Sequence, residues 1–502
     1  MSSIEEPVAG GRRAARRVAR GLLAYAGLAL LAACGGEIAP SIIEQPRVLP
    51  GPMPHAAEVD LPVTDPQTVE HITFRVRSAP GARARDVVVR FERSWLERHG
   101  AFTRLAGHAV IPVFGLYASA MNDVEIDIGI VGQGTTSTSL VIETPAEVPG
   151  ILPWVVDQAD PDLTLDYFAA QGATPPIVVD TDGAVRWCAP DFGEPVFPFL
   201  VTADGLVVGS LFSNAFHQVD WIGNRVNGQM QDARCLLSHH NLEPGKHGIL
   251  NTVTWDDGIY MRPESVIAEM TREGELLRVW DFDHIVAGAI IAEGEDPTPF
   301  VQPGVDWFHM NSAVYDASDD SVIASSRENF VIKVDYATGA IRWILGNPDK
   351  LWFQGFPNSL APLALTVNGL PPIGQHALSI SDDGSRLMCF DNGRGHIILP
   401  DIGDTRVVSR VVEYVIDPVA RTATEDWVFE LDLEDYSAFC SSAYRTRAHD
   451  VLVASSGPVD GGSAHVLLVR DNGTVAFRAS PTGRCDSAYR AIEMPWTDLV
   501  LE

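Results

Sequence analysis

The chain has 502 residues, is 46% hydrophobic and carries a formal net charge of −30 at pH 7. So acidic a surface repels nucleic acids and anionic lipid headgroups, and no nucleic-acid partner is expected. Any site for an anionic substrate must therefore be locally positive, built from a few arginine and histidine side chains against the overall field.

Residues 1–33 have the pattern of a bacterial lipoprotein signal peptide. Five arginines between Arg12 and Arg20 precede an apolar stretch, residues 21–31, which is too short to span a bilayer. Small residues lead up to Cys34, which would carry the lipid after cleavage. An ordinary signal peptide with an incidental cysteine is the alternative. In either case we expect an exported protein, facing the periplasm or cell envelope, whose only membrane contact is a lipid anchor.

The next two segments differ in their sequence patterns. Residues 34–66 are rich in proline and lack periodicity, which predicts a tether between the lipid and the first domain. Residues 67–147 contain short alternating strands, such as 71–76, 86–91 and 123–128, separated by turns that contain glycine and aspartate. This pattern predicts a small N-terminal β-sandwich.

One hairpin pattern recurs across residues 148–502: an apolar strand, a turn with Asp or Gly, and a second strand that often carries Trp. It occurs six times, at 177–187, 219–227, 266–280, 332–343, 414–427 and 466–477. The copies are spaced more widely than compact four-stranded propeller blades require, which implies insertions. An irregular large sandwich is the alternative, but it does not easily produce six similar hairpins. We therefore predict an all-β chain, with a six-bladed β-propeller following the sandwich.

Three histidines follow successive hairpins. In a propeller, residues shortly after each hairpin face the central channel. His240, His309 and His376 follow the second, third and fourth copies at nearly equal intervals of 69 and 67 residues. A lone histidine is more often a structural residue, but three in register predict imidazoles that meet at a common point.

Two further side chains could handle an anion near those histidines. Arg327 ends a short apolar run, and its forked donors suit a tetrahedral oxyanion. The alternative for Arg327 is an ion pair with a carboxylate such as Asp335. Asn311 could donate its amide to the same oxyanion or cap a turn. Residues 391–393, Asp-Asn-Gly, are typical of a tight turn and are assigned no chemistry.

Five cysteines remain beyond Cys34, and none has the Cys-x-x-Cys spacing typical of a zinc site. Their odd number leaves at least one unpaired. Export permits a disulfide, for which Cys440 and Cys485 are the candidate pair.

Several of these segments together resemble the bacterial arylsulfotransferase family, exported enzymes that move a sulfuryl group between phenols without a nucleotide sulfate donor. The similar segments are 108–117 with Asn122, 238–241, 306–312 with 325–327, and 374–376 with 390–393. The resemblance implies that His376 is transiently sulfated and that His240, His309 and Arg327 surround the sulfuryl group, with Asn311 and Tyr117 as substrate-binding residues. Asn241, where an aspartate is common, and residues 242–246 depart from the family pattern.

The expected chemistry follows from these residue types. Sulfuryl transfer through a loose transition state spreads charge over three oxygens and the departing phenolate, and fixed Arg and His donors stabilise that charge. A neutral imidazole is a competent nucleophile, and a second one, best assigned to His309, can exchange a proton with the phenols. We expect a ping-pong reaction between an aryl sulfate donor and a phenolic acceptor, with no cofactor, nucleotide or metal.

Two other functions remain open. The histidines could hold a divalent metal in a propeller hydrolase, although few carboxylates accompany them in the sequence; Asp306 lies three residues before His309, on the other side of a strand's alternation. A non-catalytic propeller that displays a binding surface from the membrane would need no such cluster. The sequence determines neither the identity of the two phenols nor the oligomeric state.

Overall fold

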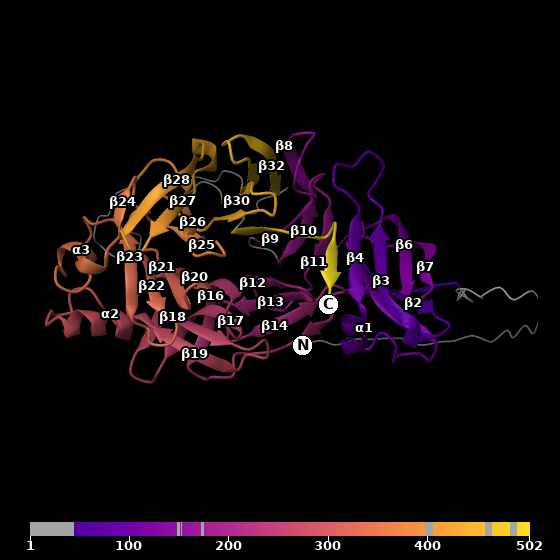
Figure 1. Ribbon diagram of the computed structural model, residues 1–502, viewed down its shortest axis with the longest axis horizontal. Helices are drawn as coiled ribbons and strands as arrows, with labels where there is room; N and C mark the ends of the chain where they lie inside the picture. Colours follow the sequence, from indigo (N-terminus) through magenta and orange to yellow (C-terminus); the bar gives the residue numbers. More distant parts are fainter. Residues whose placement is uncertain are drawn as a thin grey trace, which may run out of the picture. The chain divides into compact units, whose positions relative to one another are not determined.

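The computed structural model describes residues 45–147, 151, 153–171, 175–396, 405–456, 464–481 and 489–502. The predictions for the signal peptide, for Cys34 and for Cys485 fall outside these residues. Within them the protein is nearly all β, as predicted (Figure 1). In the part of the chain that the structure describes, no helix is both long and apolar enough to cross a bilayer.

Two sheets near the N-terminus share one hydrophobic core. Val59 and Leu61 of the first sheet and Phe74 and Phe91 of the second are fully buried in it. The first sheet has the order β1 (Arg47–Pro50), β2 (Ala56–Pro62), β5 (His108–Phe114). The second has the order β34 (Leu499–Leu501), β4 (Val87–Glu92), β3 (Val69–Val76), β6 (Met121–Ile130), β7 (Gly134–Glu143).

The predicted tether and the predicted C-terminal boundary are both corrected by these sheets. β2 pairs along its whole length with β5, so much of residues 34–66 belongs to the fold. Prolines at and near the ends of this strand, among them Pro50 and Pro62, gave the segment the composition of a linker although the strand is buried. At the other end of the chain, β34 pairs in parallel with β4 and completes the second N-terminal sheet.

The rest of the described chain forms six further sheets in sequence order. The first consists of β11 (Val185–Cys188), β10 (Ile177–Asp180), β9 (Tyr167–Gln171) and the late strand β33 (Arg490–Glu493). The second is β12 (Val196–Thr202), β13 (Gly205–Ser210), β14 (Phe216–Asp220), β15 (Arg225–Val226), and the third is β16 (Cys235–Pro244), β17 (Ile249–Asp256), β18 (Met261–Met270), β19 (Leu276–Asp281).

The fourth sheet is β20 (Met310–Asp316), β21 (Ser321–Ser326), β22 (Phe330–Asp335), β23 (Ile341–Gly346). The fifth is β25 (His376–Ile380), β26 (Arg386–Asp391), β27 (Arg410–Asp417), β28 (Thr422–Glu430), with β24 (Thr366–Asn368) added in parallel. The sixth is β29 (Ser442–Arg445), β30 (Val451–Ser455), β31 (His465–Val469), β32 (Val475–Pro481), with β8 (Trp154–Ala159) at its outer edge.

All six hairpins predicted from the sequence are present, each as an antiparallel pair within one of these sheets. Their turns are held by the side chains that marked them in the sequence. Asp180 accepts hydrogen bonds from the backbone N–H groups of Asp182 and Ala184, and Asp335 does the same for Ala337 and Thr338. An aspartate that bonds the backbone two to four residues later fixes the turn.

One edge strand of each sheet contacts the edge strand of the next. The series runs β12, β16, β20, β25, β29, β33. It closes because Arg490 on β33 donates to the carbonyl of Phe199 on β12 at 3.0 Å. Residues at the beginning of these strands therefore lie close to one another although they are far apart in the sequence.

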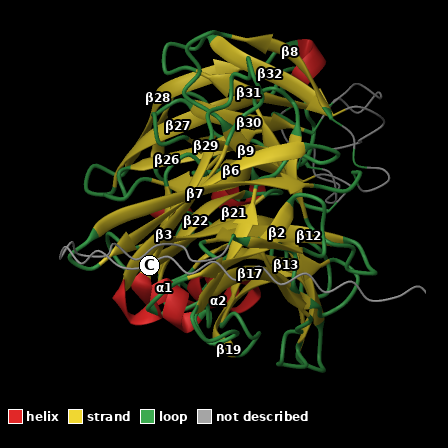
Figure 2. Cartoon of the chain, turned by 90° about the vertical axis from the view of Figure 1, so that its right-hand side faces the viewer, coloured by secondary structure: helices red, strands yellow, loops and turns green. Residues whose placement is uncertain are grey.

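Among the residues that the structure describes, helices are few and short (Figure 2). They are α1 (Arg93–Arg98), α2 (Phe282–Ala292), α3 (Leu351–Gln354) and the 3-10 turns η1 (Pro66–Thr68), η2 (Ala361–Leu363) and η3 (Leu433–Asp435). Helix α2 matters for the site, because it packs through Val286 and Ile290 in the same core cluster as Trp307 and Phe308. The indole of Trp307 also donates to Asp283 at 2.8 Å. These contacts fix the segment that leads into His309.

Candidate active site

Each of three neighbouring edge strands has a break in register where the predicted site residues lie. The breaks fall between Ser238 and Leu242 on β16, between Met310 and Ser312 on β20, and between His376 and Ser379 on β25. A bulge re-aims side chains that a regular strand would send to alternate faces. This explains how consecutive residues, His239 and His240, can contact the same carboxylate.

The structure brings together the three histidines that the spacing predicted to meet. The ring centroid of His240 lies 5.2 Å from that of His309 and 6.2 Å from that of His376. The backbone around them is unusual: His309, Ala377 and Cys440 all have positive φ, at 47°, 50° and 62°. Non-glycine residues rarely adopt this conformation, and such strain often accompanies functional sites.

His376 is held as a neutral imidazole. Its Nδ1 lies 2.7 Å from the Oδ1 of Asn392, so Nδ1 carries the proton and donates it. Its Nε2 accepts a hydrogen bond from the backbone N–H of Cys440 at 3.2 Å, so this atom carries the lone pair. Burial, followed by the positive charge of Arg327, holds the pKa of His376 well below 6.5.

Asn392 was interpreted from the sequence as part of a turn without chemistry, and that interpretation was wrong. Its amide nitrogen donates to the carbonyls of Ser437 and Cys440 at 2.8 and 3.0 Å. Those two bonds turn the amide oxygen towards His376. An Asp-Asn-Gly segment is so common in turns that its sequence alone gave no sign of this contact.

His309 is held in the opposite way, by carboxylates. Its Nδ1 lies 2.6 Å from Asp306 and 3.1 Å from Glu264. Burial alone would lower the pKa of His309, but the hydrogen bond to Asp306 and the charge of Glu264 outweigh it and raise the pKa above 6.5. His309 therefore holds a proton more tightly than a free imidazole does.

Asp306 was expected on the wrong side of a strand to reach His309, and the structure corrects this. Strand β20 begins only at Met310, so Asp306 and His309 lie in a turn rather than in an alternating strand. Positive φ at His309 bends the chain so that the two side chains meet.

Glu264 on β18 is a central residue that the sequence did not reveal. One carboxylate oxygen lies 2.9 Å from His239, and the other lies 3.2 Å from His240 and 3.1 Å from His309. Burial opposes its ionisation, but these imidazoles outweigh burial and hold the pKa of Glu264 well below 4.5. The available signal was Pro263 inside a central strand, a position where proline usually marks an irregularity.

Arg327 and Asn311 are both buried beside His376. Arg327 donates to Glu328 at 2.8 Å and to the carbonyl of Ala438 at 3.2 Å, and its charge acts on His376. Asp335, the partner that the sequence left open, pairs instead with Arg342 at 2.7 Å. The amide of Asn311 donates at 2.7 Å to the carbonyl of Gln375, the residue before His376, so Asn311 contacts the peptide that presents the imidazole.

Two tyrosines differ from the expectation. Tyr117 lies in the N-terminal region, where its ring centroid is 3.7 Å from the guanidinium carbon of Arg186 and its hydroxyl accepts a hydrogen bond from the backbone N–H of Ala79. Tyr489, directly before β33, was missed in the sequence. Its hydroxyl lies 3.1 Å from Nδ1 of His240 and its ring packs 4.3 Å from that of Phe197. Burial holds the pKa of Tyr489 well above 10, so the phenol stays protonated.

Comparison with known proteins identifies the family of this chain. Residues 156–490 match the family model for arylsulfotransferase (ASST). This chain belongs to the arylsulfotransferase family. It is 32% identical over 218 residues to the arylsulfate sulfotransferase AssT of Escherichia coli O6:H1, covering 35% of this chain and 36% of that protein. It is 27% identical over 251 residues to the AssT of Lelliottia amnigena, covering 41% and 42%.

The matched segments thus span about a third to two fifths of the curated arylsulfotransferases. Among solved structures, the β-propeller domain of Cps50 (Swd1) from Myceliophthora thermophila aligns with 69% of this chain and 89% of that one. Its TM-score is 0.36 and its identity 11%, so the likeness is too distant to support an argument.

The histidine cluster also has groups that could hold a metal ion. His239, His240 and Glu264 form one such set, and Glu264, Asp306 and His309 form another, with ligand atoms within 4.8 Å of one another in each. The expectation that carboxylates are scarce around these histidines was therefore wrong. Two carboxylates reach them, one from a different strand and one through a turn.

Proposed function

We propose that this protein transfers a sulfuryl group from an aryl sulfate ester to a phenolic acceptor, through a sulfohistidine on His376 in a ping-pong reaction. One observation supports this above the others. Two imidazoles of one cluster are biased towards opposite protonation states: the pKa of His376 is held well below 6.5, with its lone pair on Nε2, and the pKa of His309 is raised above 6.5. A nucleophile and a general acid are the two groups that the transfer needs.

In the first half-reaction Nε2 of His376 attacks the sulfur of the donor and the bond from sulfur to the phenolic oxygen breaks. The departing phenolate takes the proton of His309 and leaves as a phenol. His376 then carries the SO₃ group on Nε2, and its Nδ1 proton stays on the hydrogen bond to Asn392.

In the second half-reaction the acceptor phenol gives its proton to His309 and its oxygen attacks the sulfur. The sulfur–nitrogen bond breaks, which restores neutral His376 and protonated His309. The donor and acceptor exchange roles at the same two imidazoles, so neither a nucleotide nor another cofactor enters the balance.

Three groups held in fixed positions, Arg327, His309 and His240, stabilise the negative charge that develops on the transferring sulfuryl group. Arg327 is buried and positive beside His376, and the carboxylates near His309 lie on the far side of that imidazole from its Nε2. His240 lies near both His309 and His376. Such donors act strongly because they are held in place before the reaction and are screened little by water. We assign Asn311 to positioning His376, and place Tyr117 outside the reacting groups.

The proposal also covers the domain architecture and the location of the protein in the cell. The closed series of edge-strand contacts supports a six-bladed β-propeller with the histidines at its axis, and the shared core of the two N-terminal sheets supports a β-sandwich. The sequence pattern of residues 1–33 supports export and a lipid anchor on Cys34, with an aryl sulfate and a phenol as partners in the cell envelope.

The test is incubation with a chromogenic aryl sulfate, with and without a phenol acceptor. Donor alone should give a protein adduct with the mass of one SO₃ group, located on His376 by peptide mapping, and added phenol should remove it. His376→Ala should form no adduct and show no turnover. His247→Ala is the matched control, because His247 packs on Tyr336 away from the cluster. Retained turnover in His376→Ala would sink the assignment.

A metal-dependent hydrolase is the second candidate, because two His/carboxylate sets lie in the same cluster. Exhaustive chelation separates the two functions. Sulfuryl transfer should survive chelation unchanged, whereas loss of activity that Zn²⁺ or Mn²⁺ restores would favour the hydrolase. A non-catalytic binding protein would show neither turnover nor adduct.

A further inference from the structure

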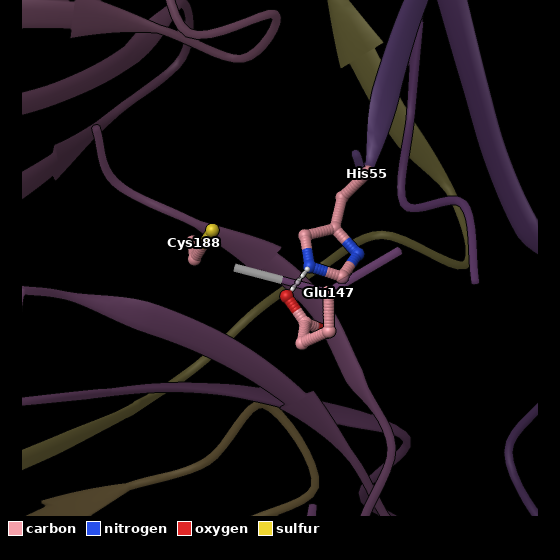
Figure 3. Close-up of side chains that lie close together, drawn as sticks. All are labelled: His55, Glu147 and Cys188. Atoms are coloured by element: carbon pink, nitrogen blue, oxygen red, sulfur yellow. Dashed lines mark hydrogen bonds and ion pairs between the residues drawn. The ribbon is translucent and has the colours of Figure 1, made fainter. Parts of the chain in front are cut away.

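A second cluster of reactive side chains lies outside the histidine cluster, between the N-terminal sheets and the first sheet of the following region. It contains His55, directly before β2, Glu147, which follows β7, and Cys188, the last residue of β11. Figure 3 shows the three side chains gathered together from three separate parts of the chain. Their candidate ligand atoms all lie within 4.8 Å of one another.

The orientation of His55 is fixed by a backbone carbonyl. Its Nδ1 lies 3.1 Å from the carbonyl oxygen of Leu116, which can only accept, so Nδ1 carries a proton. This leaves Nε2 pointing at the Oε1 of Glu147, 2.9 Å away. Nδ1–H bound to a carbonyl is the usual support for a histidine that ligates a metal through Nε2.

The site is largely shielded from solvent. The side chain of His55 is fully buried, Cys188 is 2% exposed, and the side chain of Glu147 is 28% exposed. Cys188 is a free thiol.

We propose that His55, Glu147 and Cys188 form a binding site for a divalent transition metal of the zinc class. Imidazole nitrogen, thiolate sulfur and carboxylate oxygen are the three ligand types of Zn²⁺, and three protein ligands leave the fourth tetrahedral position for water. Binding releases the thiol proton, because the metal ligand is the thiolate. The cysteine spacing in the sequence gave no hint, because the three ligands come from distant segments.

The site would tie three segments together rather than take part in sulfuryl transfer, so it stands independently of the proposed function. Metal bound to the folded protein alone stabilises it by mass action. Saturating Zn²⁺ should therefore raise the Tm of the chelator-stripped full-length protein, by roughly a few degrees.

Cobalt distinguishes this site from the histidine cluster. Co²⁺ titrated into the stripped protein should give the near-ultraviolet absorption of a thiolate–cobalt bond at one equivalent, and Zn²⁺ should abolish it. Cys188→Ser should lose the band and the Zn²⁺-dependent rise in Tm. Cys235→Ser, the matched buried free thiol, and Cys440→Ser, the thiol beside His376, should keep both.

The outcomes are decisive in each direction. If wild-type protein saturated with Co²⁺ shows no thiolate band, the proposal is wrong, whether or not Cys188→Ser folds. A band lost in Cys440→Ser but kept in Cys188→Ser would move the ion to the histidine cluster and overturn the proposal equally. His55→Gln should weaken Co²⁺ binding while leaving the thiol available to alkylation in denaturant.

Discussion

The two sides of the histidine cluster use the same residue type with opposite partners. On one side His376 is bonded to the amide of Asn392 and lies near Arg327, and on the other His309 is bonded to Asp306 and Glu264. The amide accepts a hydrogen bond but carries no charge, so the buried imidazole stays neutral; the carboxylates stabilise the imidazolium. Protonation state is thus set by the neighbours of each ring, not by the ring itself.

The largest effect that tests this comparison comes from His309. Replacement by Gln removes the proton donor, and general acid–base catalysis is worth about 10²–10⁴-fold in rate. Donors with poor leaving groups should lose activity in that range, because their phenolate needs the proton. Donors with a strongly acidic phenol should lose far less. Steady-state rates across a series of aryl sulfates would measure this, and an equal loss for all donors would argue against an acid role for His309.

A smaller effect is expected from replacing the amide that bonds His376 by a carboxylate. Asn392→Asp places a negative charge 2.7 Å from His376, and this charge should raise the pKa of the imidazole because it stabilises the protonated form. The reaction needs neutral His376, so activity is lost as pH falls through this pKa. The acid limb of the pH profile, which lies below pH 6.5 in the wild type, should move upward.

The control for this change is Asn392→Ala, which removes the hydrogen bond without adding a charge. Its acid limb should not move upward, although its rate should fall because His376 is oriented less well. The profile of kcat/KM against pH reports the pKa of the free enzyme and is the measurement to use. An unmoved acid limb in Asn392→Asp would mean that His376 does not act as the neutral nucleophile.

The hairpins and the convergence of the three histidines could be predicted because local sequence patterns encode both. Each hairpin has turn residues that mark it in the sequence. The nearly equal spacing of His240, His309 and His376 predicted that their side chains meet, and their rings lie close together in the structure. Runs of apolar residues, such as those in β21 and β22, made these strands predictable too.

The partners of the histidines were not predictable in the same way. Glu264 and Tyr489 reach the cluster from other strands, and Asn392 does so through a turn that resembles any other. Asp306 was placed wrongly because strand alternation was extended past the point where β20 begins. The contacts of Glu264 and Asp306 depend on the positive φ of Glu264 and of His309, which local sequence patterns do not encode.

The smallest expected effect comes from Tyr489, which contacts His240 and lies near His376. Its hydroxyl bonds to His240, and its ring centroid lies 6.5 Å from that of His376. Tyr489→Phe removes one hydrogen bond, worth about 0.5–1.5 kcal/mol, and so should lower the transfer rate by roughly 2- to 12-fold while keeping the packing against Phe197.

Where that loss falls decides what Tyr489 does. If its phenol only orients His240, the half-reactions with donor and with acceptor should slow equally, because His240 lies beside both His309 and His376. If it contacts the incoming phenol, single-turnover adduct formation should be unchanged and only the discharge of the sulfohistidine should slow. A change in adduct formation alone fits neither role, and would place Tyr489 on the donor side of the site.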